Sequence, residues 1–433
     1  MTRTTSVVVL TIYMAVLLLV PSRFVFAPLG AAGTPAGMLA CVLLLWYIMA
    51  WLSPRSAAVV RERQPMRLAM GLFLAAALAS YAAAVARPLE TIELNAVDRG
   101  MITVLGWTGV VLLAADSIDR MENLERIRRR LVAFGTFLAI IGILQYLFGL
   151  DISQYIRIPG LAQQGDYASL LSRDNLRRPA GTSLHPLEFG MVLGMLIPLA
   201  IHGARYAPDG KRGRRWLQVG LITMAMFMTV SRSAFMALGI ALVIILPLWT
   251  KQERRKAYLV GFLFLAAVQG LAPGLVGTLR RLVSNIGTDG STRFRLQDYD
   301  AVFYYFPQHP WFGRGFATWL PKQYRILDNQ YLVSLLDIGL LGVVALISLF
   351  VHSWVMARSV RKRCEDPAVQ HLAQCFAAII AMAAFTFGTY DTFAFPMASG
   401  MTFLMFGLCG ALWRLIRVPA IARQRARELV LAS

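Results

Sequence analysis

The chain of 433 residues is 57% hydrophobic and only 15% charged, with a mean hydropathy of +0.58 and a formal net charge of +20. A soluble domain carries about 25% charged residues, so this composition excludes a water-soluble globular protein and predicts an all-α, polytopic integral membrane protein. The net charge would also fit a nucleic-acid-binding protein, and only the position of the basic residues separates these two interpretations.

Apolar runs of about 16 to 25 residues recur along the whole chain, and each is long enough to cross roughly 30 Å of hydrocarbon. We therefore expect one membrane domain over residues 1–433 with about twelve transmembrane helices. The first run follows Arg3 without a convincing cleavage site and is expected to remain as an uncleaved span. The predicted spans are residues 5–20, 36–52, 68–86, 100–115, 131–149, 187–203, 216–230, 234–249, 257–272, 330–356, 369–389 and 395–416.

The basic residues follow the predicted topology. About two thirds of the 43 Lys and Arg residues fall at the termini and in the even-numbered connections, in clusters such as "PRSAAVVRERQPMR", "DGKRGRR" and "KQERRK". Because cytoplasmic loops are enriched in Lys and Arg, both termini are expected in the cytoplasm and the number of spans is expected to be even. The positive charge is thereby assigned to topology and anionic lipid contact, and no nucleic-acid partner is expected.

The first of two long extracytoplasmic loops, about residues 150–186, ends in "NLRRPAGTSLHPLEFG". Arg177, Arg178 and His185 stand at the entry to the sixth span, where the amides of a helix N-terminus also favour anions. His185 is interpreted either as a hydrogen-bonded structural residue or as a catalytic one. Glu188 lies one turn into the apolar helix and is expected to be the counter-ion of these arginines or a base.

The stretch of residues 216–249 is apolar except for one charge, Arg232. As one helix its 34 residues would be about 51 Å long, so a hairpin with its turn at residues 231–233 is expected. Each arm is then shorter than the hydrocarbon core, which places Arg232 below the outer surface in a protein cavity. Its guanidinium fits a phosphate or a carboxylate there. Alternatively, Arg232 extends outward to water or pairs with a structural carboxylate such as Glu188.

The second long loop, about residues 273–329, is rich in aromatic residues. The spacing of residues 291–306 predicts a helix that lies against the outer mouth of the protein and ends at Pro307. Its expected aromatic face consists of Phe294, Tyr299, Phe303 and Phe306. The alternative is an aromatic belt at the membrane interface that binds no ligand.

Asp328 and Asn329 end this loop directly before the tenth span. Both residue types cap helix N-termini well, so a capping role is one interpretation. The other is that Asp328 acts as a base beside an arginine-lined site on the outer face.

Three segments of the chain resemble the O-antigen ligase and polymerase superfamily in their order, spacing and sidedness. They are the turn "RRPAGTSLHPLEFG", the hairpin "TVSRSAFMALG" and the loop that runs from "STRFRLQDYD" through "HPWFGRGFATW" to "DNQYLVSLLDIGLLG". The similarity covers about residues 175–345 in motifs and the whole chain in topology. It implies a GT-C-like, metal-independent glycosyltransferase of the bacterial cytoplasmic membrane. Such an enzyme takes a glycan from undecaprenyl diphosphate on the outer face and transfers it to a glycan, lipid or protein.

The resemblance also implies roles for individual residues. Family arginines that hold the donor's diphosphate correspond to Arg178, Arg232 and either Arg293 or Arg295. The family ligases usually carry a His-Asn pair where this chain has Asp328 and Asn329. If that histidine is the base that activates the acceptor hydroxyl, either Asp328 does this work with its carboxylate or another residue has taken the role. The complete set of candidate site residues is Asp328, Arg232 and Arg178 for catalysis and Arg177, His185, Glu188, Arg293, Arg295 and Asn329 for substrate binding.

The chemistry of such a transfer is compatible with these residues. Arginines stabilise the leaving diphosphate, and a carboxylate accepts the proton of the attacking hydroxyl. No metal and no cofactor are expected, because the nearest pair of outer carboxylates, Asp298 and Asp300, would diverge on a helix. The alternative function is a transporter or flippase, which would show two similar halves and binding groups at the midplane. The sequence leaves open whether the enzyme is a ligase or a polymerase.

Overall fold

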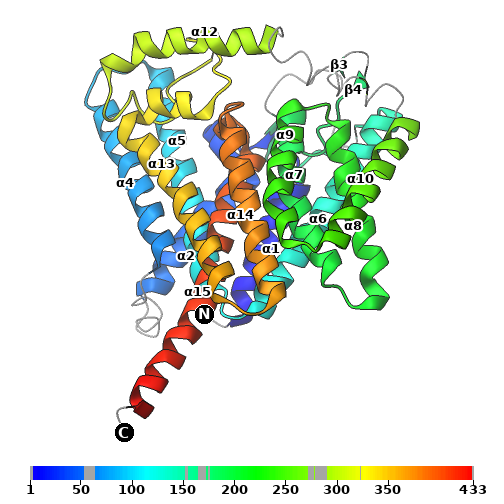
Figure 1. The fold of residues 1–433 in the computed structure, drawn as a ribbon. Coiled ribbons are helices and arrows are strands. Elements are labelled where there is room, and N and C mark those ends of the chain that lie inside the picture. Colours follow the sequence, from blue (N-terminus) through cyan, green and yellow to red (C-terminus); the bar gives the residue numbers. More distant parts are fainter. Residues whose placement is uncertain are drawn as a thin grey trace.

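The computed structural model describes residues 3–52, 64–151, 155–163, 172–173, 176–271, 277, 290–321 and 323–431. Most of these residues form α-helices that pack into one bundle (Figure 1). The helices are α1 (Arg3–Leu19), α2 (Pro35–Leu52), α4 (Pro65–Val85), α5 (Thr91–Ser117), α6 (Met121–Phe148), α7 (Pro186–Arg205), α8 (Asp209–Met228), α9 (Arg232–Ile245), α10 (Lys251–Leu271), α12 (Gly290–Tyr305), α13 (Gln330–Arg363), α14 (Pro367–Phe387) and α15 (Pro396–Leu431).

Short elements connect these helices at their ends. Four 3₁₀ segments are η1 (Ala27–Gly33), η4 (Leu246–Leu248), η5 (Phe306–Gln308) and η6 (Thr392–Ala394). Two antiparallel pairs of two-residue strands are β1 (Phe24–Val25) with β2 (Ala162–Gln163), and β3 (Ser172–Arg173) with β4 (Leu176–Arg177).

Eight of the described helices are long and apolar enough to cross a membrane, namely α2, α4, α5, α6, α7, α13, α14 and the Pro396–Arg417 part of α15. Shorter apolar segments are Ser6–Leu19 and Arg232–Leu248. Every predicted span overlaps a helix, but α8 and α10 begin with the basic clusters "DGKRGRR" and "KQERRK". The prediction of an all-α, polytopic membrane protein is therefore confirmed, whereas the number of twelve spans is not.

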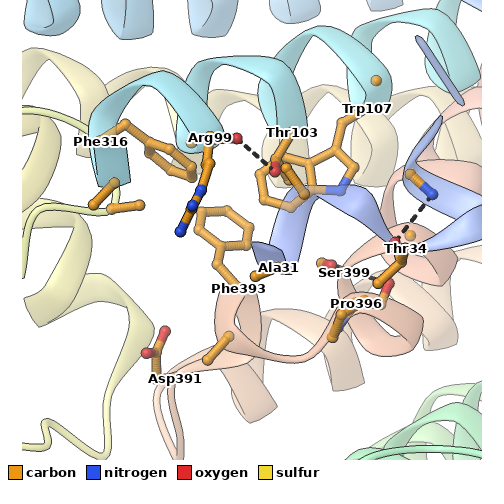
Figure 2. A pocket seen from close by; sticks show the side chains of 18 of the residues that line it. Ala31, Thr34, Arg99, Thr103, Trp107, Phe316, Asp391, Phe393, Pro396 and Ser399 are labelled. Atoms are coloured by element: carbon orange, nitrogen blue, oxygen red, sulfur yellow. Dashed lines mark hydrogen bonds between the residues drawn. The ribbon is translucent and has the colours of Figure 1, made fainter. Parts of the chain in front are cut away.

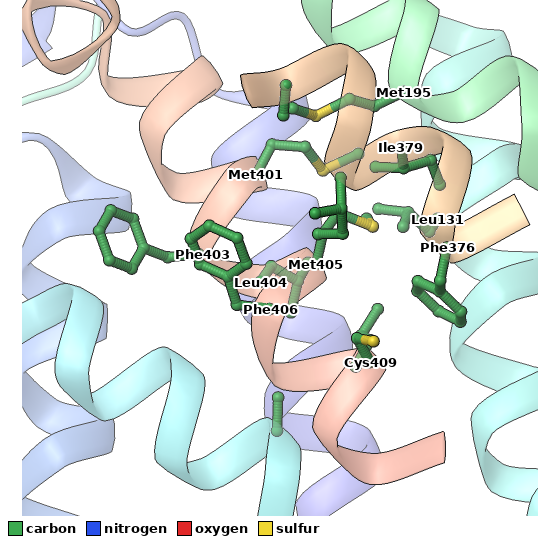
Figure 3. Close-up of a cluster of buried hydrophobic side chains, with 14 of the residues drawn as sticks. Leu131, Met195, Phe376, Ile379, Met401, Phe403, Leu404, Met405, Phe406 and Cys409 are labelled. Atoms are coloured by element: carbon green, nitrogen blue, oxygen red, sulfur yellow. The ribbon is translucent and has the colours of Figure 1, made fainter. Parts of the chain in front are cut away.

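Helices α7 and α15 form the centre of the bundle. Within the apolar windows of these two helices, 94% and 83% of the residues are buried inside the protein, against 17% for α2. Met195 of α7 lies near Met401, Met405 and Ile379 in a densely packed apolar cluster (Figure 3). By contrast, Leu45 and Met49 on α2 are more than half exposed, as expected for side chains that face lipid.

The predicted break of residues 216–249 into two helices is confirmed, although α8 packs mainly against α6 and α7, and α9 mainly against α14 and α7. Helix α8 ends at Met228 and α9 begins at Arg232, so the turn comprises residues 229–231 and lies slightly earlier than expected. Val230 has a positive φ of 50° in this turn, and the Ser231 side chain accepts a hydrogen bond from the Ala234 amide as the N-cap of α9. The depth of Arg232 in the membrane stays a prediction.

The helix predicted over residues 291–306 is confirmed as α12, and η5 ends it at the predicted proline. In Figure 1, α12 lies across one end of the bundle, and both chain termini lie at the opposite end. Two of the predicted aromatic residues, Tyr299 and Phe303, are exposed, and Phe306 is partly buried. The side chain of Phe294 lies outside the described residues.

Candidate functional site

The turn between α8 and α9 brings two of the predicted arginines to one place. Arg178 donates a hydrogen bond from Nε to the carbonyl oxygen of Thr229 at 2.9 Å. Thr229 is fully buried in the turn, and Arg232 follows three residues later as the first residue of α9. Both guanidinium groups are half-buried. The positive end of the α9 dipole lies at the same place, so this part of the protein favours an anion.

Arg177 is placed away from this pair, although it precedes Arg178 directly. It belongs to the exposed strand β4, and its Nη1 donates to the carbonyl oxygen of Leu147 at 3.4 Å. Gly149, which ends α6 with a φ of 70°, lies directly against the same guanidinium. A cation at a helix C-terminus stabilises the unpaired carbonyls there, so Arg177 caps α6 instead of joining Arg178.

His185 is the N-cap of α7 and lies beside the arginine pair. Its Nδ1 accepts a hydrogen bond from the Leu187 amide at 3.1 Å, and its ring lies 5.9 Å from the ring of Phe395. Burial, together with the charge of Arg178, lowers the pKa of His185 to about 4. The imidazole is therefore neutral near pH 7 and carries its proton on Nε2. This arrangement suits a hydrogen-bond donor and not a general base.

Glu188 differs from the prediction that it serves as counter-ion or base. The carboxylate is fully buried, and Oε2 accepts a hydrogen bond from the Leu184 amide at 2.7 Å. Oε1 accepts hydrogen bonds from the amides of Met397 and Ala398 at 2.6 and 3.1 Å. These two amides are the unpaired donors at the start of α15, so Glu188 joins the N-terminal ends of α7 and α15.

Asn329 has the capping role that was one of its two interpretations. Its side-chain oxygen accepts hydrogen bonds from the amides of Tyr331 and Leu332 at 3.0 and 3.4 Å, which begins α13. The preceding Asp328 is half-buried, and its backbone amide donates to Oδ2 of Asp298 at 3.2 Å. Asp298 also pairs with Arg325 at 2.9 Å. This contact fixes the start of α13 to the overlying helix α12 and leaves Asp328 at the α12 end of the bundle.

A carboxylate that the sequence did not single out, Asp391, lies close to Asp328. It belongs to the short connection between α14 and α15, in which Phe395 faces His185. Burial raises the pKa of Asp391 to about 7; the charge of Asp328 adds to this rise, whereas the amides of Ala394 and Phe393 oppose it. The only sequence signal for this residue is an acidic side chain in a short outer turn between two apolar spans.

Asp391 opens onto a cavity of about 410 Å³ between α1, α5, α13 and α15 (Figure 2). The volume lies within the range of about 300 to 1,000 Å³ that is typical of ligand sites. Aromatic side chains form much of its wall, and Gln330 contributes a fixed amide that accepts from the Phe393 amide at 2.6 Å and donates to Ser334. The cavity residues do not include Arg178 or Arg232.

The "GRGF" segment also contributes to this cavity. It precedes Ala317 and Trp319, whose amides each donate to the carboxylate of Asp337 at 2.9 Å. Asp337 is 4% exposed and lies on α13, where Gly339 interrupts the helix with a φ of 66°. The sequence analysis assigned no role to this carboxylate, which here fixes one wall of the cavity.

The structure does not describe the side chains of the two remaining candidate site residues. Arg293 and Arg295 lie on α12, and their side chains fall outside the described residues. Among the residues that the structure describes, no group of three or more His, Cys, Asp or Glu side chains is arranged to hold a metal ion.

The comparison with known families bears on this region. No curated protein matches the chain in sequence. Residues 217–347 match the model of the family described as O-antigen ligase, and this range extends from α8 over the Arg232 turn and α12 to the first half of α13. Arg178, His185 and Asp391 lie outside the matched range. The match agrees with the resemblance drawn from the motifs: this part of the chain is similar to the O-antigen ligase family, and the described helices are those of a multi-pass membrane protein.

Proposed function

We propose that this protein is a glycosyltransferase that transfers or polymerises a glycan from an undecaprenyl-diphosphate-linked donor. The reaction takes place on the outer face of a bacterial cytoplasmic membrane, and both termini lie in the cytoplasm. The observation that carries this proposal is the hydrogen bond from Arg178 to Thr229, because it brings Arg178 to the turn from which Arg232 projects. Two arginines beside a helix N-terminus form a suitable site for a diphosphate.

In this proposal the arginines act on the leaving group. As the bond between the anomeric carbon and the diphosphate oxygen breaks, negative charge grows on the diphosphate, and Arg178 and Arg232 stabilise it. The Nε2 proton of neutral His185 supplies a further hydrogen bond at the same place. Positive groups already in position cost little reorganisation during the reaction, so this step requires no metal.

The attacking group is a hydroxyl of the acceptor, and its proton must be accepted as the new bond to the anomeric carbon forms. Asp328 and Asp391 are the carboxylates that we assign to this step, since both lie at the outer ends of their helices. A base works best when its pKa lies near the working pH, which favours Asp391 as the proton acceptor and Asp328 as the neighbour that raises its pKa.

The test is replacement of Arg232 in the organism's own membrane. Arg232→Ala removes the charge, and we expect transfer to fall by about 100-fold or more, the loss seen when a preorganised transition-state donor is removed. Arg232→Lys keeps the charge without the planar fork and should retain part of the activity. The amount and length of surface glycan are measured beside the amount of inserted protein.

Arg157→Ala is the matched control, because Arg157 is an exposed arginine in the first outer loop. Normal surface glycan in the Arg232→Ala strain, with the protein inserted, would refute the proposal. The lipid-linked pool of a deletion strain decides between the two activities. Single repeats on the lipid mean that polymerisation is lost, whereas full-length chains mean that ligation is lost.

A further inference from the structure

The cavity beside Asp391 contains a cation that the proposed reaction does not use. Arg99 of α5 points into the cavity, and its half-buried guanidinium lies on the side opposite to Asp391 (Figure 2). Its Nη2 makes one long hydrogen bond, 3.5 Å, to the carbonyl oxygen of Pro28. Among the described residues, no carboxylate lies within ion-pair distance of Arg99. A half-buried guanidinium without an acidic partner is a suitable group for binding an anionic ligand.

The position of Arg99 is fixed by the fold around it. Its guanidinium lies directly over Gly30 of η1, where a Cβ atom would come within 2.9 Å of Nη1 and 3.0 Å of Cζ. Gly30 has a φ of 51°, which a residue with a side chain adopts only with strain. On the following turn of α5, Thr103 donates its hydroxyl to the carbonyl oxygen of Arg99 at 3.0 Å. The missing side chain at Gly30 therefore leaves room for the guanidinium at the cavity wall.

The rest of the cavity combines apolar and polar surface. Trp107 and Phe316 line the cavity and meet edge-to-face at 5.9 Å, and Trp107 also stacks at 4.5 Å on Phe403, which lies outside the lining, so the aromatic wall is rigid. Gln330 is fixed by two hydrogen bonds at another side. Sugar rings present both C–H surface and hydroxyl groups, and a site of rigid aromatic rings with a few fixed polar groups matches both.

The charges in the cavity select between the two substrates of a glycosyl transfer. Asp391 and Asp337 line the same cavity as Arg99. A diphosphate bound there would lie near two acidic groups and only one cation, so the cavity disfavours it. An acceptor sugar with a single anionic group can place that group on Arg99 and its hydroxyl near Asp391. The donor's diphosphate has its own arginines at the α8–α9 turn.

We infer that this cavity is the acceptor site and that it binds a sugar residue carrying a carboxylate or a phosphate, which Arg99 holds. The assignment of the sugar as acceptor rests on the proposed function, whereas the binding of an anionic sugar does not. Arg99 is a specificity-determining residue in this account, and Asp391 is the group that receives the proton of the bound hydroxyl.

The test measures the binding of three sugars to the full chain in lipid nanodiscs by saturation-transfer NMR. The probes are methyl glucuronide, glucose 6-phosphate and the neutral methyl glucoside. At least one anionic sugar should bind about tenfold more tightly than methyl glucoside, the gain expected from one charge-assisted hydrogen bond. The stronger of the two anionic probes identifies the carboxylate or the phosphate as the recognised group.

Arg99→Gln should abolish this preference, Arg99→Lys should retain part of it, and Arg157→Gln should leave it unchanged. Equal binding of all three sugars would overturn the inference, as would an undiminished preference in a folded Arg99→Gln protein. Displacement of the anionic sugar by inorganic diphosphate at similar concentration would also overturn it, because the cavity would then belong to the donor.

The same samples separate this inference from the proposed function. Arg232→Gln should lose glycan transfer and still bind the anionic sugar with unchanged affinity. A wild-type protein that binds the sugar but transfers no glycan from a lipid diphosphate contradicts only the proposed function. Glycan transfer without any preference for anionic sugars contradicts only the inference about the cavity.

Discussion

Three carboxylates at the α12 end of the bundle differ in role because their neighbours differ. Glu188 accepts hydrogen bonds from three backbone amides and joins two helices. Asp298 pairs with Arg325 and holds α12 to the start of α13. Asp391 faces the cavity, and burial together with the charge of Asp328 raises its pKa to about 7, so its protonation changes near neutral pH.

The raised pKa of Asp391 predicts how the transfer rate depends on pH. A base acts only when ionised, so the rate should rise with pH, reach half its maximum near pH 7, where Asp391 is half ionised, and level off above that pH. Asp391→Asn should remove this rise and lower the rate by about 100-fold or more, as expected for loss of a general base. The measurement is the initial rate of glycan transfer in nanodiscs between pH 5 and about 9.

Asp328→Asn is the companion variant for this prediction. It removes the charge that helps to raise the pKa of Asp391, so the rise in rate should move to lower pH while the maximum rate is retained. The opposite result, in which Asp328→Asn abolishes the rate and Asp391→Asn only shifts the profile, would make Asp328 the base.

Part of the site was predictable from local sequence and part was not. Arg178, Arg232 and Asn329 stand at turns whose position follows from the apolar runs beside them. The capping role of Asn329 follows from residue type alone. Asp391 and Arg99 have no local signal, because their importance arises from a cavity formed by helices that are far apart in the sequence. The hydrogen bonds of Glu188 to α15 could not be foreseen, because the amides of Met397 and Ala398 lie more than 200 residues later.

At the scale of elements, the close contact between the "GRGF" loop and α13 fixes the wall of the cavity. Gly313 and Gly339 face each other, with φ angles of 70° and 66°, and a Cβ atom at either position would lie 2.4 Å from the backbone of the opposite segment. The amides of Arg314 and Gly315 donate to the carbonyl oxygens of Leu336 and Asp337 at 2.9 and 2.8 Å. Only glycine permits this approach.

This geometry predicts that Gly339→Ala is strongly destabilising. The backbone of Gly339, with a φ of 66° and a ψ of −171°, lies in a region that costs about 1 to 3 kcal/mol for a residue with a side chain, and the contact with the carbonyl of Trp311 adds to this cost. We expect a lower midpoint of thermal unfolding in detergent and a lower rate of glycan transfer, because the loop that carries Ala317 and Trp319 loses its close contact with α13.

Gly71→Ala in α4 is the control for this variant, since a Cβ atom there meets no other atom within 4 Å. That substitution should leave the unfolding midpoint unchanged or raise it, because alanine favours a helix over glycine by about 1 kcal/mol. Equal midpoints for Gly339→Ala and the unmodified protein would show that the loop does not depend on this contact.

The elements themselves were largely predictable, and their contacts were not. Apolar length predicted the break between two helices at Arg232, and aromatic spacing followed by proline predicted α12. The interruption of α13 at Gly339 could not be read from an apolar run that continues through it. The "GRG" motif is too short to indicate, from the sequence alone, a loop that packs against α13.

At the scale of the whole molecule, the two ends of the bundle are built differently. One end contains the cavity, the arginine pair and α12. At the other end, His202 of α7 lies between His371 of α14 and Glu125 of α6. Its Nδ1 is 3.2 Å from Nδ1 of His371, and its Nε2 is 3.2 Å from Oε1 of Glu125. Trp249 donates to His371 at 3.1 Å, and Arg128 pairs with Glu125 at 2.7 Å. This closed polar network ties the helices together at the end where the chain termini lie (Figure 1).

The distribution of charge and the fold together predict the orientation of the molecule in the membrane. Lys211 belongs to the basic cluster in the first turn of helix α8, at the opposite end of α7 from His185. Tyr304 is exposed on α12. A cysteine at residue 304 should react with a membrane-impermeant maleimide in intact spheroplasts, because the positive-inside rule places α12 outside. A cysteine at residue 211 should react only after the membrane is permeabilised. Both cysteine variants also carry Cys364→Ser, which removes the labelling of the half-exposed native thiol near the basic end. Labelling of residue 211 and protection of residue 304 in intact spheroplasts would reverse the orientation and move the arginine pair to the cytoplasmic face, where the proposed reaction could not occur.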